Sequence, residues 1–195
     1  MSSSPPFQFW DTLDDPAAWL TADRDNPGRA LAALEALDDP EIRSVVEVGP
    51  GPGYDWQDFW RGSRVQYEAI EGSPGMVAHL KRTLPDMPVR VGTFEDLGTA
   101  AYDLAYVKAV LEHQRGFREA LGHLLRAARR KVLVEWYLPP GDVEELRVDA
   151  HGIPANRYAR ADVLAFLAEH GAAAEVQGFM FLGRHQELWT IRPRG

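Results

Sequence analysis

Three glycines at alternate positions, Gly49, Gly51 and Gly53, form the stretch whose residue types point most directly to chemistry. The valine-rich segment 44–48 precedes them and has the composition of a strand buried on both faces. Because glycine has no Cβ, the backbone of such a turn can come within van der Waals contact of a ligand. At the carboxyl end of a parallel strand this pattern predicts a nucleotide-like ligand, and a simple connecting turn is the alternative.

The spacing of the glycines distinguishes between the known classes of nucleotide-binding turn. A dinucleotide-binding fingerprint needs a third glycine where this chain has Tyr54. A phosphate-binding P-loop needs Lys followed by Ser or Thr after its last glycine, and Tyr54-Asp55 supplies neither. Glu47, two residues before the turn, would also repel a phosphate. The chain instead has the form E-x-G-x-G-x-G, with Pro50 and Pro52 between the glycines.

This motif resembles the first motif of the class I S-adenosylmethionine-dependent methyltransferases, in particular their small, type 11-like members. The resemblance implies S-adenosylmethionine as cofactor and S-adenosylhomocysteine as product, bound against Gly49, Pro50, Gly51 and Gly53. It also implies that Glu47 orders the turn or receives the ammonium group of the cofactor.

Glu71 ends a second predicted strand, 22 positions after Gly49 (71 − 49). A carboxylate at this position can accept hydrogen bonds from both hydroxyls of a ribose. The resemblance implies this role for Glu71, with Gly72 beside it. An ordinary surface glutamate at a strand end is the alternative.

The segment after the third predicted strand departs from the family pattern. The family often has an acidic residue there for the adenine amino group, whereas this chain has Thr93. We expect the backbone of Phe94 to contact the adenine edge and Glu95 or Asp96 to replace the missing acid.

Residues 106–113 resemble the family's fourth motif, which faces cofactor and substrate together. His113 is expected to open a helix and is the candidate general base, because histidine titrates near pH 6.5 when unperturbed. Capping that helix is the alternative role. Lys108 is expected to contact the cofactor and could also bind a carboxylate of the substrate. The alternative is a lysine that is solvated or held in a salt bridge.

Aromatic and acidic residues near the same sheet edge are candidates for contact with the substrate, and core packing is the alternative for the aromatic ones. The candidates are Trp10, Tyr106, Glu135, Trp136, Tyr137 and Tyr158. Trp10 belongs to residues 1–25, which we interpret as a tail and possible aromatic lid before a methyltransferase domain at 26–195. The chain lacks the Asn/Asp-Pro-Pro-Tyr/Phe sequence with which base-amino methyltransferases hold a flipped base.

The elements that position these residues alternate between strand and helix five times, which predicts a parallel α/β sheet. Asn26-Pro27 and Ser73-Pro74 are typical helix starts. The predicted strands lie near 44–48, 65–70, 89–92, 102–107, 132–137, 173–181 and 185–192. The last two are joined by a connection short enough only for an antiparallel hairpin. We therefore predict a Rossmann-like seven-stranded sheet, mostly parallel with a C-terminal antiparallel hairpin, and helices on both faces.

Two details of the helices follow from the same patterns. The first helix should pack through Leu31, Leu34 and Leu37. The helix before the fifth strand should run from Phe117 to about Ala128. The cations at 126 and 129–131 would then complement its dipole at the C-terminal end.

Composition narrows the function further. The chain has 195 residues, which suits one domain, and its net charge of −8 argues against affinity for nucleic acid. It has no cysteine, and its six histidines show no paired ligand spacing, so we expect no metal site. We find neither a signal peptide pattern nor an apolar run of about 20 residues, and expect a soluble cytoplasmic protein without a membrane partner.

The sequence thus predicts methyl transfer from S-adenosylmethionine to an O or N nucleophile on a small molecule. A non-catalytic protein that binds S-adenosylmethionine or S-adenosylhomocysteine as a sensor or scaffold is the alternative. The sequence does not predict the oligomeric state.

Overall fold

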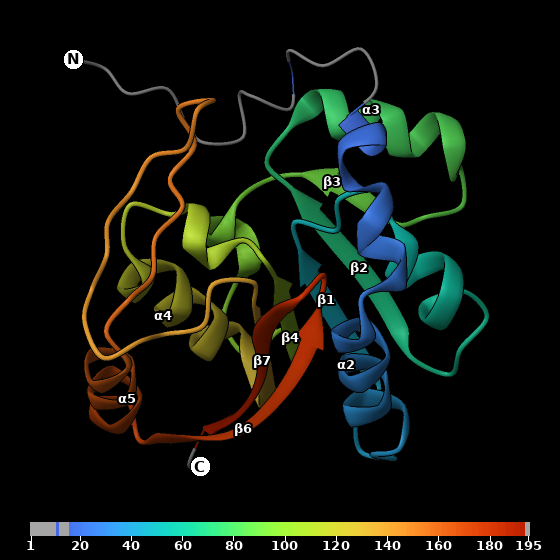
Figure 1. The fold of residues 1–195 in the computed structure, drawn as a ribbon. Coiled ribbons are helices and arrows are strands. Elements are labelled where there is room, and N and C mark those ends of the chain that lie inside the picture. Colours follow the sequence, from blue (N-terminus) through green and yellow to red (C-terminus); the bar gives the residue numbers. More distant parts are fainter. Residues whose placement is uncertain (1–10, 12–15, 194–195) are drawn as a thin grey trace.

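The computed structural model describes residue 11 and residues 16–193. Trp10 and the rest of residues 1–10 and 12–15, which make up most of the expected tail and lid segment 1–25, lie outside the described residues. Its centre is a seven-stranded sheet of order β3-β2-β1-β4-β5-β7-β6 (Figure 1). The strands are β1 (Ser44–Val48), β2 (Gln66–Glu71), β3 (Val89–Val91), β4 (Tyr102–Lys108), β5 (Ala128–Trp136), β6 (Ala172–Phe181) and β7 (Arg184–Pro193). Strands β1 to β5 pair in parallel, and β7 is antiparallel to both β5 and β6, which confirms the predicted architecture.

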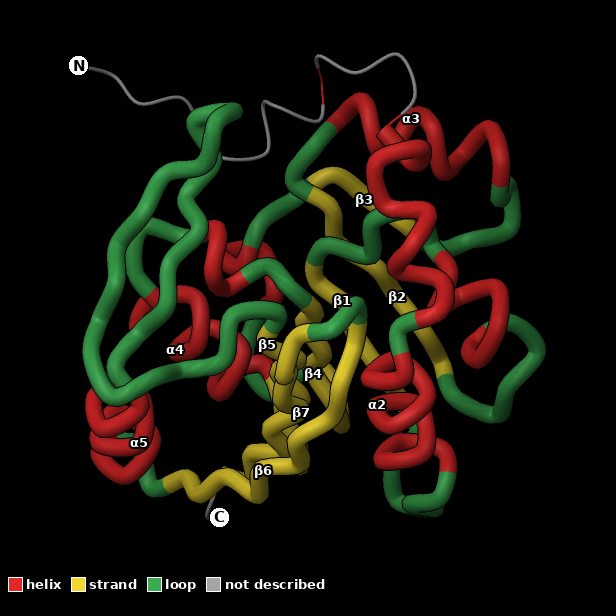
Figure 2. The backbone as a smooth tube through the Cα atoms, in the orientation of Figure 1, coloured by secondary structure: helices red, strands yellow, loops and turns green. Residues whose placement is uncertain are grey.

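Helices cover both faces of the sheet (Figure 1, Figure 2). One apolar core joins α2 (Pro27–Leu37) and α3 (Pro74–Thr83) to the sheet, and a second joins α4 (Phe117–Ala127) and α5 (Arg160–Glu169) to the opposite face. The predicted helix starts are confirmed, because Asn26 Oδ1 accepts from Gly28 N and Ser73 Oγ accepts from Met76 N, both at 2.9 Å. The short helical turns are η1 (Pro16–Asp25), η2 (Trp56–Trp60), η3 (Phe94–Leu97) and η4 (Leu111–His113).

Helix α2 packs mainly through small residues, and the predicted leucine stripe is confirmed only for Leu31 and Leu37, which pack partly buried against the core. Ala32, Ala33 and Ala36 are buried, whereas Leu34 is 52% exposed. The close approach explains the choice of residues, because a Cβ on Gly28 would lie only 2.6 Å from the carboxyl carbon of Glu135 on β5. The alanine face therefore lets the N-terminus of α2 reach the sheet.

The cations after α4 are not at a helix end, which corrects the predicted boundary. Helix α4 ends at Ala127, and Arg129 and Lys131 already belong to β5. Their charges are paired across the sheet and its connections: Arg129 Nη2 lies 2.9 Å from Asp103 Oδ1, and Lys131 Nζ lies 3.0 Å from Asp39 Oδ2. For these two residues, ion pairing with neighbouring segments replaces the expected interaction with the helix dipole, whereas Arg126 does lie in the last turn of α4.

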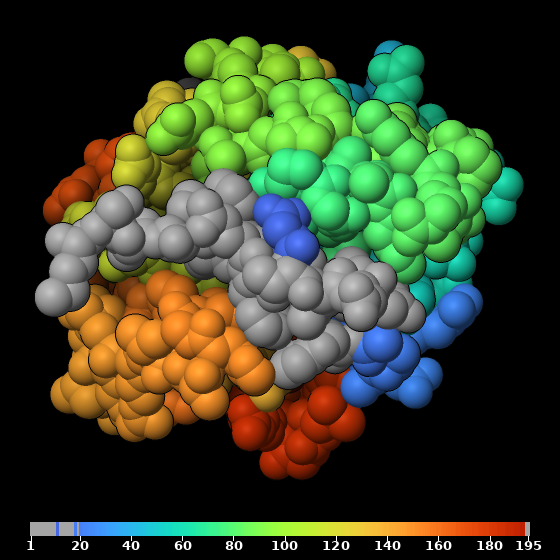
Figure 3. Space-filling model, turned by 90° about the horizontal axis from the view of Figure 1, so that it is seen from above, coloured from blue at the N-terminus to red at the C-terminus, as the bar shows by residue number. Residues whose placement is uncertain are grey.

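Two loop structures rise above the carboxyl ends of the parallel strands (Figure 2). The first, which we call the arm, comprises residues 141–159 between β5 and α5 and is held as a loose hairpin by bridges such as Glu145 with Arg157. The second, which we call the hairpin tip, comprises residues 181–184 between β6 and β7. From above, the orange arm and the red β6–β7 hairpin face the green segments that follow β2 and β3 (Figure 3). No helix among the described residues is long and apolar enough to cross a membrane.

Candidate active site

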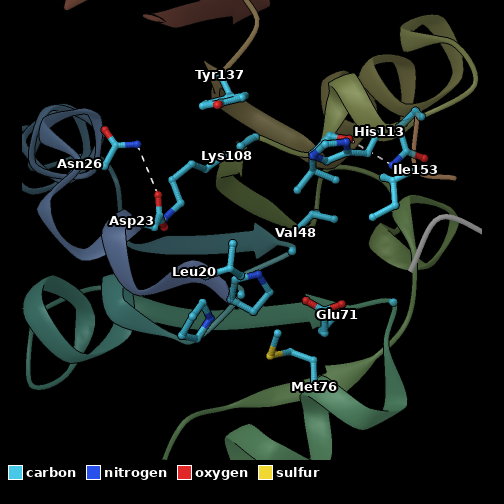
Figure 4. A pocket seen from close by; sticks show the side chains of 18 of the residues that line it. Leu20, Asp23, Asn26, Val48, Glu71, Met76, Lys108, His113, Tyr137 and Ile153 are labelled. Atoms are coloured by element: carbon cyan, nitrogen blue, oxygen red, sulfur yellow. Dashed lines mark hydrogen bonds and ion pairs between the residues drawn. The ribbon is translucent and has the colours of Figure 1, made fainter. Parts of the chain in front are cut away.

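A cavity of about 450 Å³ lies at the carboxyl ends of β1, β2, β4 and β5. Its floor is the glycine turn after β1, and one wall is formed by the ends of β2 and β3. Helix η1 lies on one side, and His113 of η4 and Ile153 of the arm lie on the other (Figure 4). The hairpin tip also contributes to the lining. The cavity therefore lies where parallel-sheet enzymes bind their ligands.

The glycine turn forms the cavity floor because its backbone requires glycine. Gly49 and Gly51 have φ of +72° and +54°, values that disfavour any residue with a Cβ. A Cβ on Gly49 would also lie 2.6 Å from Val110. Pro50 lines the cavity between them. Gly53 does not line it, because it packs against the α3 side, where a Cβ would lie 2.8 Å from Leu84 Cδ1.

Glu71 faces the cavity from the end of β2 (Figure 4). Its Oε1 accepts a hydrogen bond from Ser73 N at 2.9 Å. Burial raises the pKa of Glu71 to about 7, although backbone donors, including Ser73 and Gly72, partly offset that effect. The carboxylate keeps acceptor capacity for two hydroxyl donors, which is what a ribose presents.

Thr93 and Phe94 line the cavity beyond Glu71, as expected for an adenine-binding wall. Glu95 is exposed on η3 and does not line it. Asp96 does not face it either, because its Oδ2 accepts from Thr93 N at 2.8 Å and so caps η3. Neither acid replaces the residue that the family often places here.

Lys108 lies between two carboxylates and is therefore the salt-bridged lysine of the alternative interpretation. Its Nζ is 2.5 Å from Asp23 Oδ2 and 3.3 Å from Asp55 Oδ2, and Arg29 Nε lies 2.5 Å from Asp55 Oδ1. Burial lowers the pKa of Lys108, but the charges of Asp55 and Asp23 outweigh it and keep the pKa above its usual value. Figure 4 shows the side chain turned toward Asp23, so the cavity receives little net positive charge.

Glu47 lies beneath the glycine turn and does not line the cavity. It is fully buried, and its Oε2 accepts from the Tyr67 hydroxyl at 2.5 Å. Burial, and then the nearby charge of Asp55, raise the pKa of Glu47 well above its usual value. A buried carboxyl that holds its proton is suited to ordering the turn rather than to receiving an ammonium group.

His113 lines the cavity next to Ile153 (Figure 4). It ends η4 rather than opening a helix, and α4 begins at Phe117, which corrects the predicted position. The distance from His113 Nδ1 to the carbonyl oxygen of Pro154 is 2.6 Å. A carbonyl only accepts, so Nδ1 donates the proton and, in the neutral ring, Nε2 keeps the lone pair.

The arm holds η4 in place through several hydrogen bonds. Tyr158 donates to Leu111 O at 2.9 Å, and Asn156 Nδ2 donates to Gln114 O at 2.8 Å. Tyr158 is only 1% exposed and does not line the cavity, so its predicted contact with substrate is wrong. Its hydroxyl instead fixes the turn that carries His113.

The other predicted substrate residues divide by whether they lie within a strand or beyond its end: Tyr137 follows β5, whereas the others lie within β4 and β5. Tyr137 lines the cavity, and Arg184 Nη1 donates to its hydroxyl at 2.7 Å. Tyr106, Glu135 and Trp136 are buried in the sheet and do not line the cavity, so these predictions are wrong. Glu135 accepts from Asn26 Nδ2 at 2.6 Å, and burial raises the pKa of Glu135 to about 8.

Several lining residues were not predicted from the sequence. They are Leu20, Asp23, Asn26, Val110, Gln114, Asp149, His151, Ile153, Phe181 and Leu182. The length of the segment between β5 and α5 was one usable signal, because long loops without secondary structure are commonly functional. Asn26 carried a signal only for helix capping.

Comparisons with known proteins agree with this geometry. The sequence model of the family described as Methyltransferase domain matches residues 46–134, which include the glycine turn, Glu71 and His113. Residues 46–134 thus match a methyltransferase domain, which supports the resemblance to the class I S-adenosylmethionine-dependent methyltransferases. A search of curated protein sequences found no match to this chain.

Solved structures show the same fold at low sequence identity. The 1,6-didemethyltoxoflavin-N1-methyltransferase of Burkholderia thailandensis is 16% identical, with a TM-score of 0.68 over 94% of this chain and 92% of that one. The magnesium protoporphyrin IX methyltransferase of Synechocystis is 14% identical, with a TM-score of 0.70 over 98% and 92%. The amino pentose methyltransferase CalS10 of Micromonospora echinaspora is 15% identical, with a TM-score of 0.68 over 92% and 98%.

The residues of this methyltransferase fit S-adenosylmethionine. The turn at Gly49 and Gly51 presents bare backbone to the cavity, and Glu71 presents a carboxylate that can accept hydrogen bonds from ribose hydroxyls. Phe94 supplies an apolar surface for an adenine ring. The polar groups and the apolar surface are thus arranged in the order that the cofactor requires.

Proposed function

We propose that the methyltransferase acts on an O or N nucleophile of a small molecule, with Nε2 of His113 as the general base. The observation that carries this proposal is the hydrogen bond from Nδ1 to Pro154 O, which leaves the second ring nitrogen as an acceptor at the cavity wall. When bound, S-adenosylmethionine supplies a methyl group whose bond to sulfur breaks, leaving S-adenosylhomocysteine, as the acceptor's bond to that methyl forms.

The protein's own groups would supply position and a proton acceptor. The glycine turn and Glu71 would hold the nucleoside end of the cofactor, which fixes the direction from which the methyl group is presented. His113 would take the proton of a hydroxyl as the new bond forms, or the proton of a protonated amine before its nitrogen attacks, and release it to water after the product leaves. The arm and the hairpin tip would limit the entry of water.

The size and shape of the cavity support a small acceptor. It measures about 450 Å³, and the arm and the hairpin tip contribute residues to its wall. The similar proteins named above act on a toxoflavin precursor, a porphyrin and an amino pentose. The net charge of −8 also opposes binding to nucleic acid.

We also propose that residues 1–25 act as a lid. The described part of this segment supports the proposal, because Leu20 and Asp23 of η1 line the cavity. A Cβ on Gly51 would lie 3.3 Å from Leu20 Cδ1, so this side chain contacts the glycine turn directly. The lid would then bear on both the cofactor and the acceptor.

The experiment that tests the function is a screen of small alcohols, phenols and amines with labelled S-adenosylmethionine. Release of S-adenosylhomocysteine together with a methylated acceptor supports catalysis. Binding of S-adenosylhomocysteine without turnover on any acceptor would instead favour the sensor or scaffold alternative. A thermal scan serves as a control for the pocket, because a ligand at about 100 times its Kd should raise the Tm by roughly 5–11 °C.

A further inference from the structure

The turn of the β6–β7 hairpin contains a residue that its backbone disfavours. The turn has two residues, Leu182 and Gly183, between the paired Phe181 and Arg184. Both have positive φ, +48° and +72°. This is the turn geometry in which Asn-Gly, Asp-Gly and Gly-Gly predominate, because a Cβ is crowded in the left-handed region. A γ-branched leucine at the first position is therefore strained.

Core packing does not explain Leu182. Its side chain is 65% exposed, so it gains little apolar burial in return for the strained backbone. Leu182 therefore reduces stability in two ways, through its strained backbone and through its exposed apolar surface. An asparagine at this position would avoid both effects. Strain of this kind is concentrated at sites where function requires it.

The position of Leu182 at the cavity offers a functional reason for a leucine in this strained turn. Leu182 and its neighbour Phe181 both line the cavity, as does Ile153 of the arm. The hairpin tip is also fastened to the cavity wall. Arg184 donates to the Tyr137 hydroxyl at 2.7 Å, and its guanidinium lies 5.3 Å from the centre of that ring.

We propose that Leu182, with Phe181 and Ile153, forms an apolar rim that binds an aryl or alkyl portion of the methyl acceptor. This inference rests on the proposed function, and it narrows the acceptor to a molecule that is apolar beyond its nucleophile. The nucleophile would lie at His113, and the apolar portion would extend toward the mouth of the cavity. The rim would discriminate against compact, fully polar acceptors.

The test uses 1-anilinonaphthalene-8-sulfonate as an apolar aromatic probe on the full chain saturated with S-adenosylhomocysteine. Leu182→Asn should raise the Tm by about 2–4 °C while weakening the affinity for the probe by roughly three- to tenfold. Leu182→Gly should behave in the same way. A rise in stability together with a loss of binding is the result that a purely structural residue would not give.

Two control variants separate strain from exposure. Ala100 also has a positive φ, +46°, but does not line the cavity, so Ala100→Asn should raise the Tm without changing probe affinity. Leu146 is 60% exposed on the arm and does not line the cavity either. Leu146→Asn should leave probe binding unchanged, which excludes general surface binding.

The proposal is overturned if the wild-type protein shows no saturable probe binding, or if Leu182→Asn binds the probe as well as the wild type. It is also overturned if Leu182→Asn fails to raise the Tm, or if Leu146→Asn loses as much affinity. The acceptor screen is independent of this measurement. If that screen fails while the probe result holds, the proposed function falls and the apolar rim remains.

Discussion

The ammonium group of Lys108 lies 2.5 Å from the carboxylate of Asp23, so the end of β4 is joined directly to η1. The same ammonium contacts Asp55, whose carboxylate also binds Arg29. The charges of Lys108, Asp55 and Arg29 are almost entirely removed from water, whereas Asp23 is 21% exposed. The network therefore joins the segment before α2, the turn after β1 and the end of β4 into one unit.

Removing one member of this network should be costly. Lys108→Met leaves Asp55 with one fewer partner in a buried site, and we expect the free energy of unfolding to fall by about 3–5 kcal/mol. Urea denaturation at pH 7 measures the change. Lys81→Met, on the exposed surface of α3, is the matched control and should change stability by less than about 0.5 kcal/mol. Equal stability of the two variants would show that the pairing is not important.

Replacement of His113 should reduce turnover without reducing cofactor binding. His113→Asn removes the base at Nε2, and loss of general-base catalysis costs about 10²- to 10⁴-fold in kcat. The Kd for S-adenosylhomocysteine should stay within about threefold, because Glu71 and the glycine turn are unchanged. The measurement is steady-state release of S-adenosylhomocysteine with the acceptor found in the screen.

Two further results would judge the role of His113. Nitrogen-15 NMR at a pH at which the His113 ring is neutral should show the proton on Nδ1, because the hydrogen bond to Pro154 O requires a donor there. His79→Asn, on α3 and away from the cavity, should keep wild-type turnover. Full activity of His113→Asn would remove the histidine from the mechanism.

Cofactor affinity should decrease at low pH because of Glu71. Burial raises the pKa of this carboxyl to about 7 in the free protein, whereas ribose hydroxyls donate to its ionised form. Binding therefore requires loss of the proton below pH 7, and affinity should fall toward tenfold per pH unit as the pH decreases further. Titration calorimetry with S-adenosylhomocysteine between pH 5.5 and 8.5 measures this dependence.

Substitution of Glu71 should remove the dependence. Glu71→Gln should bind more weakly at pH 8 and show an almost flat profile, and Glu71→Ala should weaken binding by roughly 10- to 150-fold. Glu95→Gln, at an exposed carboxylate nearby, is the control and should retain the wild-type profile. A wild-type profile in Glu71→Gln would assign the titration to another group.

Glu135 should make the protein less stable as the pH rises. Burial raises its folded-state pKa to about 8, above the usual 4.5, so the unfolded chain loses this proton first. Stability present at low pH is thus lost between about pH 4.5 and 8, by up to about 1.4 kcal/mol per pH unit. Glu135→Gln keeps the acceptor for Asn26 and should be spared this loss. Urea denaturation at pH 5, 6.5 and 8 should show the two stability curves diverging, whereas the exposed Glu119→Gln should follow the wild type.

The cofactor side of the site was largely predictable from the sequence because its signals are local. Glycines at alternate positions after a valine-rich strand have a backbone reason, and the positive φ of Gly49 and Gly51 is that reason. Glu71 was found because the ends of neighbouring parallel strands meet at one edge. Gly53 shares the motif but serves packing, a difference that spacing alone does not reveal.

The acceptor side was less predictable because it depends on orientation and on distant contacts. A strand buried on both faces has no alternation of polar and apolar residues, so nothing indicated that Glu135 and Trp136 point away from the cavity. The contact between His113 and Pro154 joins residues 41 positions apart. The role of Leu182 was not predicted because its strain depends on a two-residue turn. The predicted strands left a three-residue connection, 182–184, whereas Arg184 already pairs with Phe181.

The division of the cavity has a consequence for protein engineering. Residues 46–134, which the family model covers, contain the glycine turn, Glu71 and His113, whereas the arm and the hairpin tip both follow this region. The glycine turn and Glu71, which are expected to hold the methyl donor, are therefore encoded apart from these two segments, which are expected to contribute to the choice of acceptor. Exchanging residues 141–159 and 181–184 for those of another enzyme of this fold offers a way to transplant acceptor choice while leaving the donor site untouched.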